Sequence, residues 1–192
     1  MKKKQILLIG GGGHCHSVID VIEQEDIYQI VGILDANKSI GEMVLGYEII
    51  GSDKDLEKFF KEYAYAFIAI GHIRSNTSRV ELFHKLKSIG YEIPTIVSPL
   101  AYLSRHATIH EGSIIMHHAL VNANAVISEN CIINTKALIE HDAIIEEHVH
   151  ISTGAIINGG VRVKKNSFIG SNATVKEGVE VDDFVKAGSL YI

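Results

Sequence analysis

Aliphatic residues recur every six positions through the second half of the chain. From Val97 to Ile192 the sequence divides into sixteen hexads, and fifteen of them begin with Val, Leu or Ile. The fifth position of most hexads is small, as in Ala119 and Ala125. A period of six fits neither an amphipathic helix, at about 3.6, nor a half-exposed strand, at about 2. It predicts a parallel β-helix with three hexads to a coil and with the first and fifth positions of each hexad inside. The predicted register is unbroken through the last hexad, which begins at Ala187.

The first half of the chain follows a different pattern, in which short apolar runs alternate with amphipathic segments. Alternating strands and helices of this length predict a small doubly wound, Rossmann-like parallel sheet. The change of pattern predicts two domains, over residues 1–96 and 97–192. The elements expected in the first domain are a strand at 5–9, a helix ending near Glu25, a strand at 30–34, a helix at 53–63, a strand at 64–70, a helix at about 75–89 and a strand at 92–97.

Composition narrows the classes of function. The net charge of −5 provides no basic surface for nucleic acid. The apolar run from Ile6 to Ile9 is too short for a signal sequence or a membrane span, so we expect a cytoplasmic protein without membrane insertion. Cys15 and Cys131 are isolated, which predicts two thiols rather than a disulfide or a metal-binding pair.

A glycine loop, Gly10-Gly11-Gly12-Gly13, directly follows the first predicted strand. Glycines let the backbone approach a phosphate closely, and the N–H groups that open the next helix favour its negative charge. Asp35 ends the second strand, where a Rossmann-type domain places the carboxylate that holds a ribose hydroxyl. The loop therefore predicts a nucleotide site. Cys15 stands where G-x-G-x-x-G requires glycine, so a glycine turn without a ligand is the alternative.

Seven of the eleven histidines lie in the β-helix half, and His141 stands between Glu140 and Asp142. Histidine is the natural general base near neutral pH, and a neighbouring carboxylate can orient it. Eighteen residues later, one coil on and about 4.8 Å away, stands Gly159. A base next to an unhindered backbone N–H suits acyl transfer, in which the N–H receives the developing oxyanion. A solvated histidine between two acids is the alternative.

With these motifs the whole chain resembles the hexapeptide-repeat sugar acetyltransferases that carry an N-terminal Rossmann-like domain. That family includes N-acetyltransferases of nucleotide-linked 4-amino sugars and sialic acid O-acetyltransferases. The resemblance implies a left-handed β-helix, acetyl-CoA as co-substrate, and a homotrimer with acetyl-CoA between two subunits. The motifs that carry it are Ile9-Gly10 through Gly13-His14, Ile68-Ala69-Ile70-Gly71, Asn134-Thr135, Ile139-Glu140-His141-Asp142 and His150-Ile151-Ser152-Thr153-Gly154-Ala155.

The resemblance also implies roles for single residues. His141 would be the general base, Asp142 would hold it, and the N–H of Gly159 would polarise the thioester carbonyl. The remaining implied positions are Glu140, Asn134 and His150 in the active site, His14, Gly71, Asp35 and the glycine loop toward the sugar nucleotide, and His150, Gly159 and Ala173 toward acetyl-CoA. No metal is implied.

Four other functions compete with N-acetylation of a nucleotide-linked amino sugar, for which UDP is the favoured nucleotide. Sialic acid O-acetylation is the first, although a free sialic acid would not need the glycine loop and Asp35. A zinc site like that of the hexapeptide-repeat carbonic anhydrases would use two histidines five residues apart, a spacing that this sequence lacks. An NAD-dependent oxidoreductase would use only the glycine loop. A non-enzymatic solenoid scaffold would have no use for an acid-flanked His141.

Overall fold

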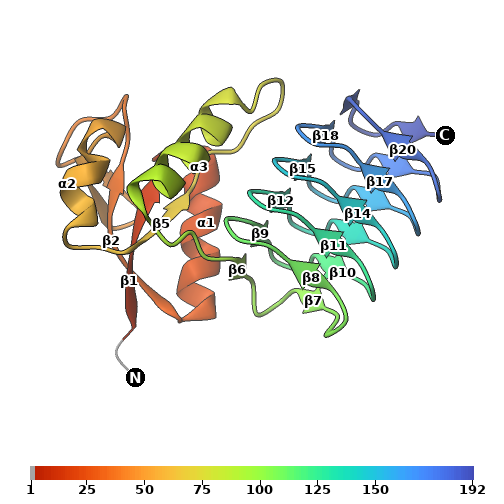
Figure 1. Cartoon of the computed structure of the whole chain (residues 1–192), viewed down its shortest axis with the longest axis horizontal. Coiled ribbons are helices and arrows are strands. Elements are labelled where there is room, and N and C mark those ends of the chain that lie inside the picture. Colours follow the sequence, from red (N-terminus) through yellow and green to blue (C-terminus); the bar gives the residue numbers. More distant parts are fainter. Residues whose placement is uncertain (1–2) are drawn as a thin grey trace. The chain divides into compact units, whose positions relative to one another are not determined.

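The computed structural model of the chain describes residues 3–192, which divide into two compact units (Figure 1). The first unit holds the described residues up to Gly71 together with Thr77–Pro94. The second unit holds Thr95–Ile192 together with the short segment His72–Asn76. The chain therefore passes from the first unit to the second and back between the last strand and the last helix of the first unit.

The first unit is a five-stranded sheet with helices, in the strand order β3-β4-β2-β1-β5. Its four longer strands pair in parallel, and β3 pairs antiparallel to β4. The elements are β1 (Lys4–Ile9), α1 (Gly13–Glu25), β2 (Tyr28–Leu34), β3 (Met43–Val44), β4 (Tyr47–Gly51), a 3₁₀ turn (Asp53–Asp55), α2 (Leu56–Phe60), β5 (Tyr65–Ile68) and α3 (Thr77–Ile89).

The core of this unit consists of the apolar runs that predicted it. Ile6 to Ile9 of β1 are at most 1% exposed, and α1 buries its apolar stripe from Cys15 to Ile22. Burial raises the pKa of the Cys15 thiol to about 12, so the thiol stays protonated. Asp26 ends α1 in the left-handed conformation, and its N–H donates to the carbonyl of Ile22.

The structure of the first unit differs from the prediction in three places, one missed hairpin and two predicted elements that form differently. The hairpin of β3 and β4 was missed because β3 has only two residues, too few for a period to register. The helix expected at 53–63 is a 3₁₀ turn followed by the short α2. The strand expected at 92–97 does not form, since Pro94 has no N–H to donate. Glu92 makes one isolated bridge to Tyr65, and Ile96 begins the β-helix instead.

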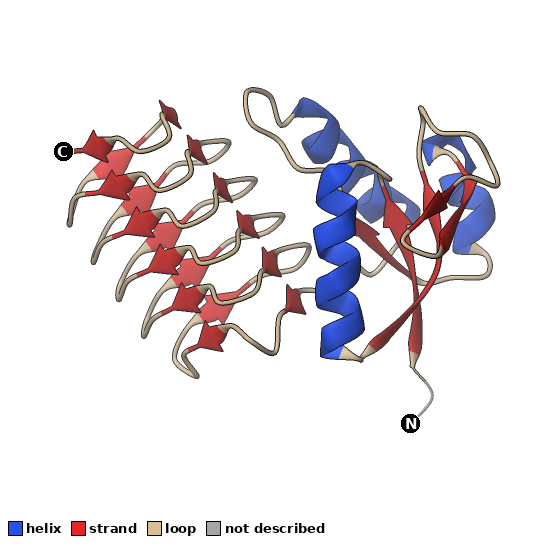
Figure 2. Cartoon of the chain, turned by 180° about the vertical axis from the view of Figure 1, so that it is seen from behind, coloured by secondary structure: helices blue, strands red, loops and turns tan. Residues whose placement is uncertain are grey.

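The second unit is a prism of three parallel sheets built from two-residue strands (Figure 2). We call these sheets the first, second and third faces. The first face contains β7 (Tyr102–Leu103), β10 (Leu120–Val121), β13 (Leu138–Ile139), β16 (Ile156–Ile157), β19 (Thr174–Val175) and β22 (Leu190–Tyr191). The second contains β8 (Thr108–Ile109), β11 (Val126–Ile127), β14 (Ile144–Ile145), β17 (Arg162–Val163) and β20 (Glu180–Val181). The third contains β6 (Ile96–Val97), β9 (Ile114–Ile115), β12 (Ile132–Ile133), β15 (His150–Ile151), β18 (Phe168–Ile169) and β21 (Phe184–Val185).

The hexad pattern predicted the interior of this prism. First positions such as Ile139 and Ile157, and fifth positions such as Ala143, are fully buried in one continuous core. The fourth position lies at the corner and takes a positive φ, for example +60° at Asn124 and Asp142. Asn, Asp and Gly adopt that conformation at the lowest cost. The predicted fold class, a Rossmann-like domain followed by a left-handed parallel β-helix, is confirmed.

The predicted register is wrong after Val181, in the last two hexads. Phe184 and Val185 pair with Phe168 and Ile169, so β21 follows β20 after two corner residues, where the other corners have four. Val185, expected in a fifth position, therefore takes the inward first position and is 4% exposed. Ala187, expected to point inward, lies instead in the next corner.

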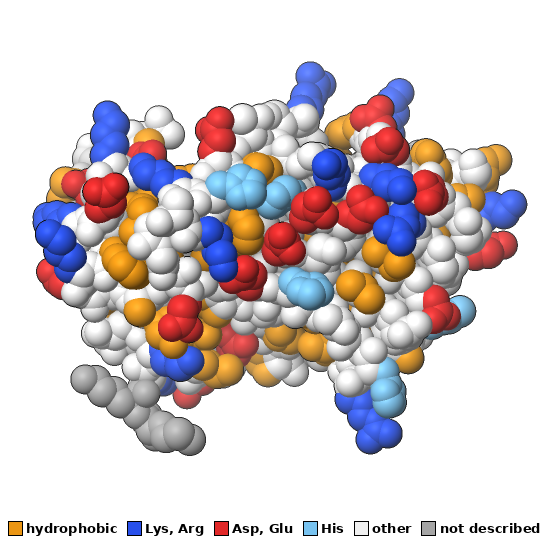
Figure 3. Space-filling view, viewed as in Figure 1, with side chains coloured by type: hydrophobic (Ala, Val, Ile, Leu, Met, Phe, Trp, Pro, Cys, Tyr) orange, Lys and Arg blue, Asp and Glu red, His pale blue; other side chains and the backbone are white. Residues whose placement is uncertain are grey.

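The surface carries charges of both signs. On the face drawn in Figure 3, Asp and Glu side chains lie interspersed with Lys and Arg, so neither sign forms a continuous patch there. Such a surface produces no large field of one sign over that face. Among the described helices, none is both long enough and apolar enough to cross a membrane.

Candidate active site

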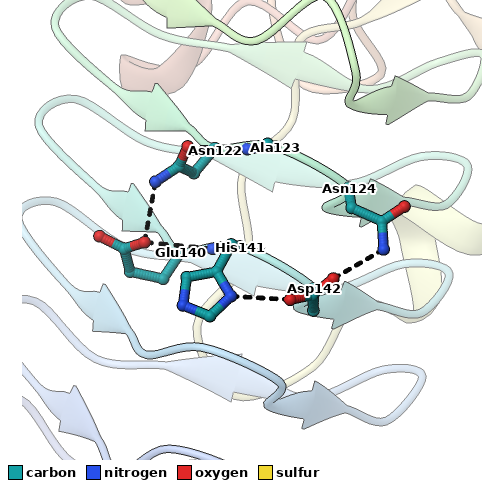
Figure 4. A network of polar contacts seen from close by, with 6 residues as sticks. All are labelled: Asn122, Ala123, Asn124, Glu140, His141 and Asp142. Atoms are coloured by element: carbon teal, nitrogen blue, oxygen red, sulfur yellow. Dashed lines mark hydrogen bonds and ion pairs between the residues drawn. The ribbon is translucent and has the colours of Figure 1, made fainter.

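The predicted catalytic pair lies at the corner between the first and second faces (Figure 4). The Nδ1 atom of His141 is 2.7 Å from Oδ2 of Asp142, and the two side chains are 62% and 55% exposed. Asp142 adopts its left-handed corner conformation, and its N–H donates to the carbonyl of Ala123 on the preceding coil. The corner therefore presents the imidazole to solvent, with its carboxylate partner already in contact.

The preceding coil supplies two further supports that the sequence analysis missed. Asn124 donates from Nδ2 to Oδ1 of Asp142 at 2.7 Å, and Asn122 donates from Nδ2 to Oε2 of Glu140 at 2.8 Å. Glu140 also accepts from the backbone N–H of His141 at 3.1 Å. Both asparagines stand eighteen residues before their partners, so the coil length could have identified them from the sequence.

These contacts set the charges at the corner. The hydrogen bond to Asp142 raises the pKa of His141, and the charges of Asp142 and Glu140 act in the same direction. The hydrogen bond from Asn124, followed by that from His141, lowers the pKa of Asp142. Near neutral pH Asp142 is therefore a carboxylate, and its contact with Nδ1 leaves Nε2 of a neutral imidazole able to accept a proton.

Gly159 lies against the imidazole on the next coil. A Cβ atom at this position would lie 2.8 Å from Cε1 and 2.9 Å from Nε2 of His141, closer than any side chain can approach. The N–H of Gly159 donates no hydrogen bond within residues 3–192, whereas the N–H of Gly160 donates to the carbonyl of His141. A histidine that could act as a base and an available backbone donor therefore stand side by side, an arrangement that suits acyl transfer.

The pH dependence of the reaction tests the contact between His141 and Asp142. We expect kcat/KM to fall as His141 becomes protonated, with an apparent pKa above that of an ordinary histidine. Asp142→Asn keeps a residue that accepts the left-handed corner but removes the carboxylate that raises the pKa, so the acid limb moves to lower pH. Rate profiles of both proteins check this, with Asp183→Asn, an exposed carboxylate outside the corner, as the control. An acid limb at unchanged pH in Asp142→Asn contradicts the role of the pair.

Asn134 and His150 occupy another edge of the prism. Asn134 follows β12 at the corner between the third and first faces, and His150 begins β15 on the third face. Nε2 of His150 is 3.2 Å from Nδ2 of Asn134, so these two contact each other. Within one chain they stand at a different corner from His141. Ala173 is a fully buried fifth position two coils beyond Ala137.

The glycine loop of the first unit is tied to the end of β2 by Asp35. The Asp35 carboxylate accepts three backbone hydrogen bonds, from Gly11 at 2.6 Å, Asn37 at 2.8 Å and Lys38 at 3.1 Å. Gly10 has a φ of +100°, and a Cβ there would lie 2.3 Å from the side chain of Ile70, so only glycine fits. These contacts hold the loop at the carboxyl ends of β1, β2 and β5.

The rest of the predicted nucleotide site surrounds the start of α1. Gly12 precedes this helix and Gly13 begins it, and a Cβ at either position would meet no atom within 4 Å. Gly71 lies against the His14 side chain, since a Cβ there would be 3.2 Å from Cγ. The backbone at the start of α1 is therefore open, as close approach of a phosphate requires.

A pocket of about 320 Å³ lies beside this loop within the first unit. Gly10 and Asp35 are among its lining residues, and α3 contributes others that the sequence analysis did not single out. No motif marks these residues, which reach the site only because α3 packs beside β5. They are Ser78, Glu81, Leu82 and Lys85.

Two family models match the chain. Residues 5–86 match the PglD N-terminal domain, and residues 142–177 match the bacterial transferase hexapeptide, a model of six repeats. The resemblance drawn from the sequence is confirmed. The chain thus matches a PglD N-terminal domain followed by bacterial transferase hexapeptide repeats, and the predicted enzyme class, an acyltransferase, is confirmed. A search of curated proteins found no match.

Solved structures with the same architecture include two acetyltransferases. The chain is similar to the acetyltransferase domain of PglB from Neisseria gonorrhoeae in complex with acetyl coenzyme A, with 28% identity, a TM-score of 0.89 and coverage of 97% of this chain and 90% of that one. It is also similar to a histidine-to-alanine mutant of GDP-perosamine N-acetyltransferase from Caulobacter crescentus in complex with CoA and GDP-perosamine. That comparison gives 29% identity, a TM-score of 0.91 and coverage of 98% and 88%. WeeI from Acinetobacter baumannii, at 21% identity, a TM-score of 0.63 and coverage of 98% and 96%, shares the fold.

Proposed function

We propose that the chain transfers an acetyl group from acetyl-CoA to the amino group of a nucleotide-linked amino sugar. The observation that carries the proposal is the corner at which His141, held by Asp142, lies against Gly159. Two similar structures, one with bound acetyl coenzyme A and one with CoA and GDP-perosamine, support this class of substrates. The glycine loop and its pocket give the nucleotide a place to bind in the first unit.

The proposed reaction requires one proton acceptor and one oxyanion donor. The amine attacks the thioester carbonyl, the C–N bond forms, and the amine loses a proton to Nε2 of His141. The N–H of Gly159 donates to the carbonyl oxygen as its negative charge develops. The carbonyl then re-forms, the C–S bond breaks, and CoA leaves as the thiolate, which takes up the proton. Asp142 stabilises the imidazolium that exists between these two proton transfers.

Two nucleotides, UDP and GDP, are candidates for the one that carries the amino sugar. The sequence resemblance favours a UDP-linked sugar, whereas one similar structure contains GDP-perosamine. A panel of UDP-, GDP-, dTDP- and CMP-sugars, each with and without a 4-amino group, tests the proposal by acetyl-CoA-dependent release of free thiol. We expect turnover only with 4-amino sugars. Turnover of sialic acid, with none of the amino sugars accepted, favours the alternative O-acetyltransferase.

We propose that the active form is a homotrimer joined through the first face. The residues that point outward from this face are apolar, apart from one threonine, and several are well exposed, including Tyr102 at 59% and Leu190 at 66%. Three prisms packed by this face about a threefold axis would place the His141 corner of one copy beside the Asn134 corner of the next. This packing would unite the two groups of predicted catalytic residues, which one chain keeps on separate edges.

Substitution on two faces of one coil tests the trimer. Leu138→Glu adds a charge to the first face, and we expect it to convert a species of three times 21.1 kDa into a monomer that has lost activity. The matched control, Ile144→Glu, adds the same charge to the second face and leaves the trimer intact. Light scattering after size exclusion measures both. A fully active monomer of the unsubstituted chain rules the trimer out.

Substitution in the glycine loop tests the nucleotide site. We expect Gly12→Val to raise KM for the sugar nucleotide much more than KM for acetyl-CoA, because its side chain fills the space in which a diphosphate would approach. Gly12 suits this test because a Cβ there meets no atom within 4 Å, whereas Gly10 needs its positive φ. Equal rises in both KM values, together with a lower melting temperature, point to a folding defect and against the site.

A further inference from the structure

His150 uses both nitrogen atoms of its ring in the interior of the second unit. The side chain is 6% exposed. Nδ1 lies 2.7 Å from the carbonyl oxygen of His72, and Nε2 lies 3.2 Å from Nδ2 of Asn134. Phe168 covers the ring on one side, at 5.1 Å between ring centres and nearly at right angles. A buried imidazole with two polar contacts of this kind has one protonation state that satisfies both.

The partners determine that state. A carbonyl oxygen can only accept, so Nδ1 of His150 carries a proton and donates it to His72. Oδ1 of Asn134 accepts from the backbone N–H of Thr135 at 2.8 Å, which orients the amide and turns its Nδ2 toward the imidazole. Nδ2 can only donate, so Nε2 of His150 accepts. Both bonds form with the neutral Nδ1–H tautomer, whereas the imidazolium would place a second N–H against the amide N–H.

The first of these bonds belongs to a larger attachment. The segment His72–Asn76 is also held by Asn76, whose Nδ2 donates to Oδ1 of Asn166 at 2.8 Å and to the carbonyl of His148 at 3.2 Å. The rings of His72 and His150 lie 5.2 Å apart. Gly71, the residue before this segment, is one of the predicted sugar-nucleotide residues. The segment that His150 holds therefore begins at the residue directly after Gly71 in the chain.

We propose that His150 is a positioning residue with two separate tasks, and that it neither donates nor removes a proton in the reaction. Its Nδ1–H anchors the segment His72–Asn76, and its Nε2 orients the side chain of Asn134. This inference rests on the proposed function, which makes Asn134 part of the active site and Gly71 part of the sugar-nucleotide site. If the two tasks are separate, a substitution that removes only one of the two contacts should cause a different kinetic defect from a substitution that removes only the other.

Asparagine and glutamine separate the two tasks, because their amides match different ring nitrogens. His150→Asn can place an N–H where Nδ1 stands, which keeps the bond to His72 and loses the acceptor for Asn134. We expect kcat to fall about tenfold or more, since a misplaced active-site group is costly, with little change in KM for the sugar nucleotide. His150→Gln can place an oxygen where Nε2 stands and loses the bond to His72. We expect its main defect to be a rise of about fivefold in that KM, the value of one lost hydrogen bond.

Two measurements without substrate separate a failure of this inference from a failure of the proposed function. Hydrogen exchange of the amides at 72–76 is expected to quicken about fivefold in His150→Gln and to stay unchanged in His150→Asn. In protein labelled with ¹⁵N-histidine, the signal that His150→Asn removes is expected to show a protonated Nδ1 and an unprotonated Nε2 at neutral pH. His118→Asn, at an exposed corner with a φ of +58°, is the control for all measurements.

The outcomes are distinct. The split between kcat and KM, together with the Nδ1–H tautomer, supports the positioning role. An Nε2–H tautomer or an imidazolium at neutral pH overturns it. Equal losses of kcat in His150→Asn and His150→Gln, with KM and hydrogen exchange unchanged, also overturn it and make His150 a proton-transfer group. If the unsubstituted chain acetylates no amino sugar, hydrogen exchange and the tautomer still decide whether His150 makes both contacts.

Discussion

His141→Ala lowers kcat for acetyl transfer by at least about a hundredfold, since general-base assistance is typically worth ~10²–10⁴ in rate. The amine must shed a proton as the C–N bond forms, and we propose that His141, whose side chain is 62% exposed at the corner, accepts it. Asp142→Ala costs less, because an imidazole without its partner still accepts a proton part of the time. Thiol release measured across about pH 6 to 9 gives both values, and the acid limb of the profile disappears with His141.

The His141 result requires that the variant keep its assembly and its acetyl-CoA binding. The side chain is largely exposed, so its removal leaves no cavity in the core. Size exclusion and titration with acetyl-CoA check both properties. His110→Ala, which removes another exposed corner histidine, is the matched control and keeps normal kcat. Near-normal kcat in His141→Ala over the whole pH range shows that the base lies elsewhere.

Gly159→Ala lowers kcat by about tenfold to a hundredfold with little loss of stability, because displacement of a catalytic group by about 1 Å can cost that much. The added Cβ would lie 2.8 Å from the His141 ring, which must swing away. The backbone of Gly159 does not use a positive φ, so alanine fits its conformation. Steady-state kinetics and thermal unfolding of the variant measure the two effects.

A double variant distinguishes the cause of the Gly159 effect. If the methyl group acts by displacing His141, then Gly159→Ala costs little more once His141 is alanine. The backbone N–H, the proposed oxyanion donor, is present in both residues and does not change. A full additional loss in the double variant contradicts displacement of the ring and indicates that the methyl group blocks a substrate.

The β-helix could be predicted almost completely because each hexad has the same two packing demands. One large aliphatic residue must fill the prism, as Ile139 does, and one small residue must fit beside the corner, as Ala143 does. The first unit has no such repetition. Its hairpin of β3 and β4 follows from a tight turn at Leu45 and Gly46, both with positive φ, and a two-residue strand leaves no periodic signal.

Some contacts of the candidate site could be predicted from the sequence, and others could not. One coil has eighteen residues, so the residue one coil after His141 is Gly159, and the structure brings the two into contact. The same arithmetic applied backward finds Asn124 opposite Asp142. The contact between His150 and His72 has no such rule, because a segment of another part of the chain supplies the carbonyl. Contacts within the repeat can be counted from the sequence, and contacts that depend on how a connecting segment packs require coordinates.

The shortened corner before β21 indicates where this fold accepts insertions and deletions. Side chains alternate between the two sides of a strand, so a corner that is two residues shorter than the others, Asp182-Asp183, leaves Val185 inside and Phe184 outside. Removal of one residue would turn both around and expose the aliphatic core. Corner length can therefore vary in even steps, and the addition of eighteen residues would lengthen the prism by one coil while every later side chain kept its direction.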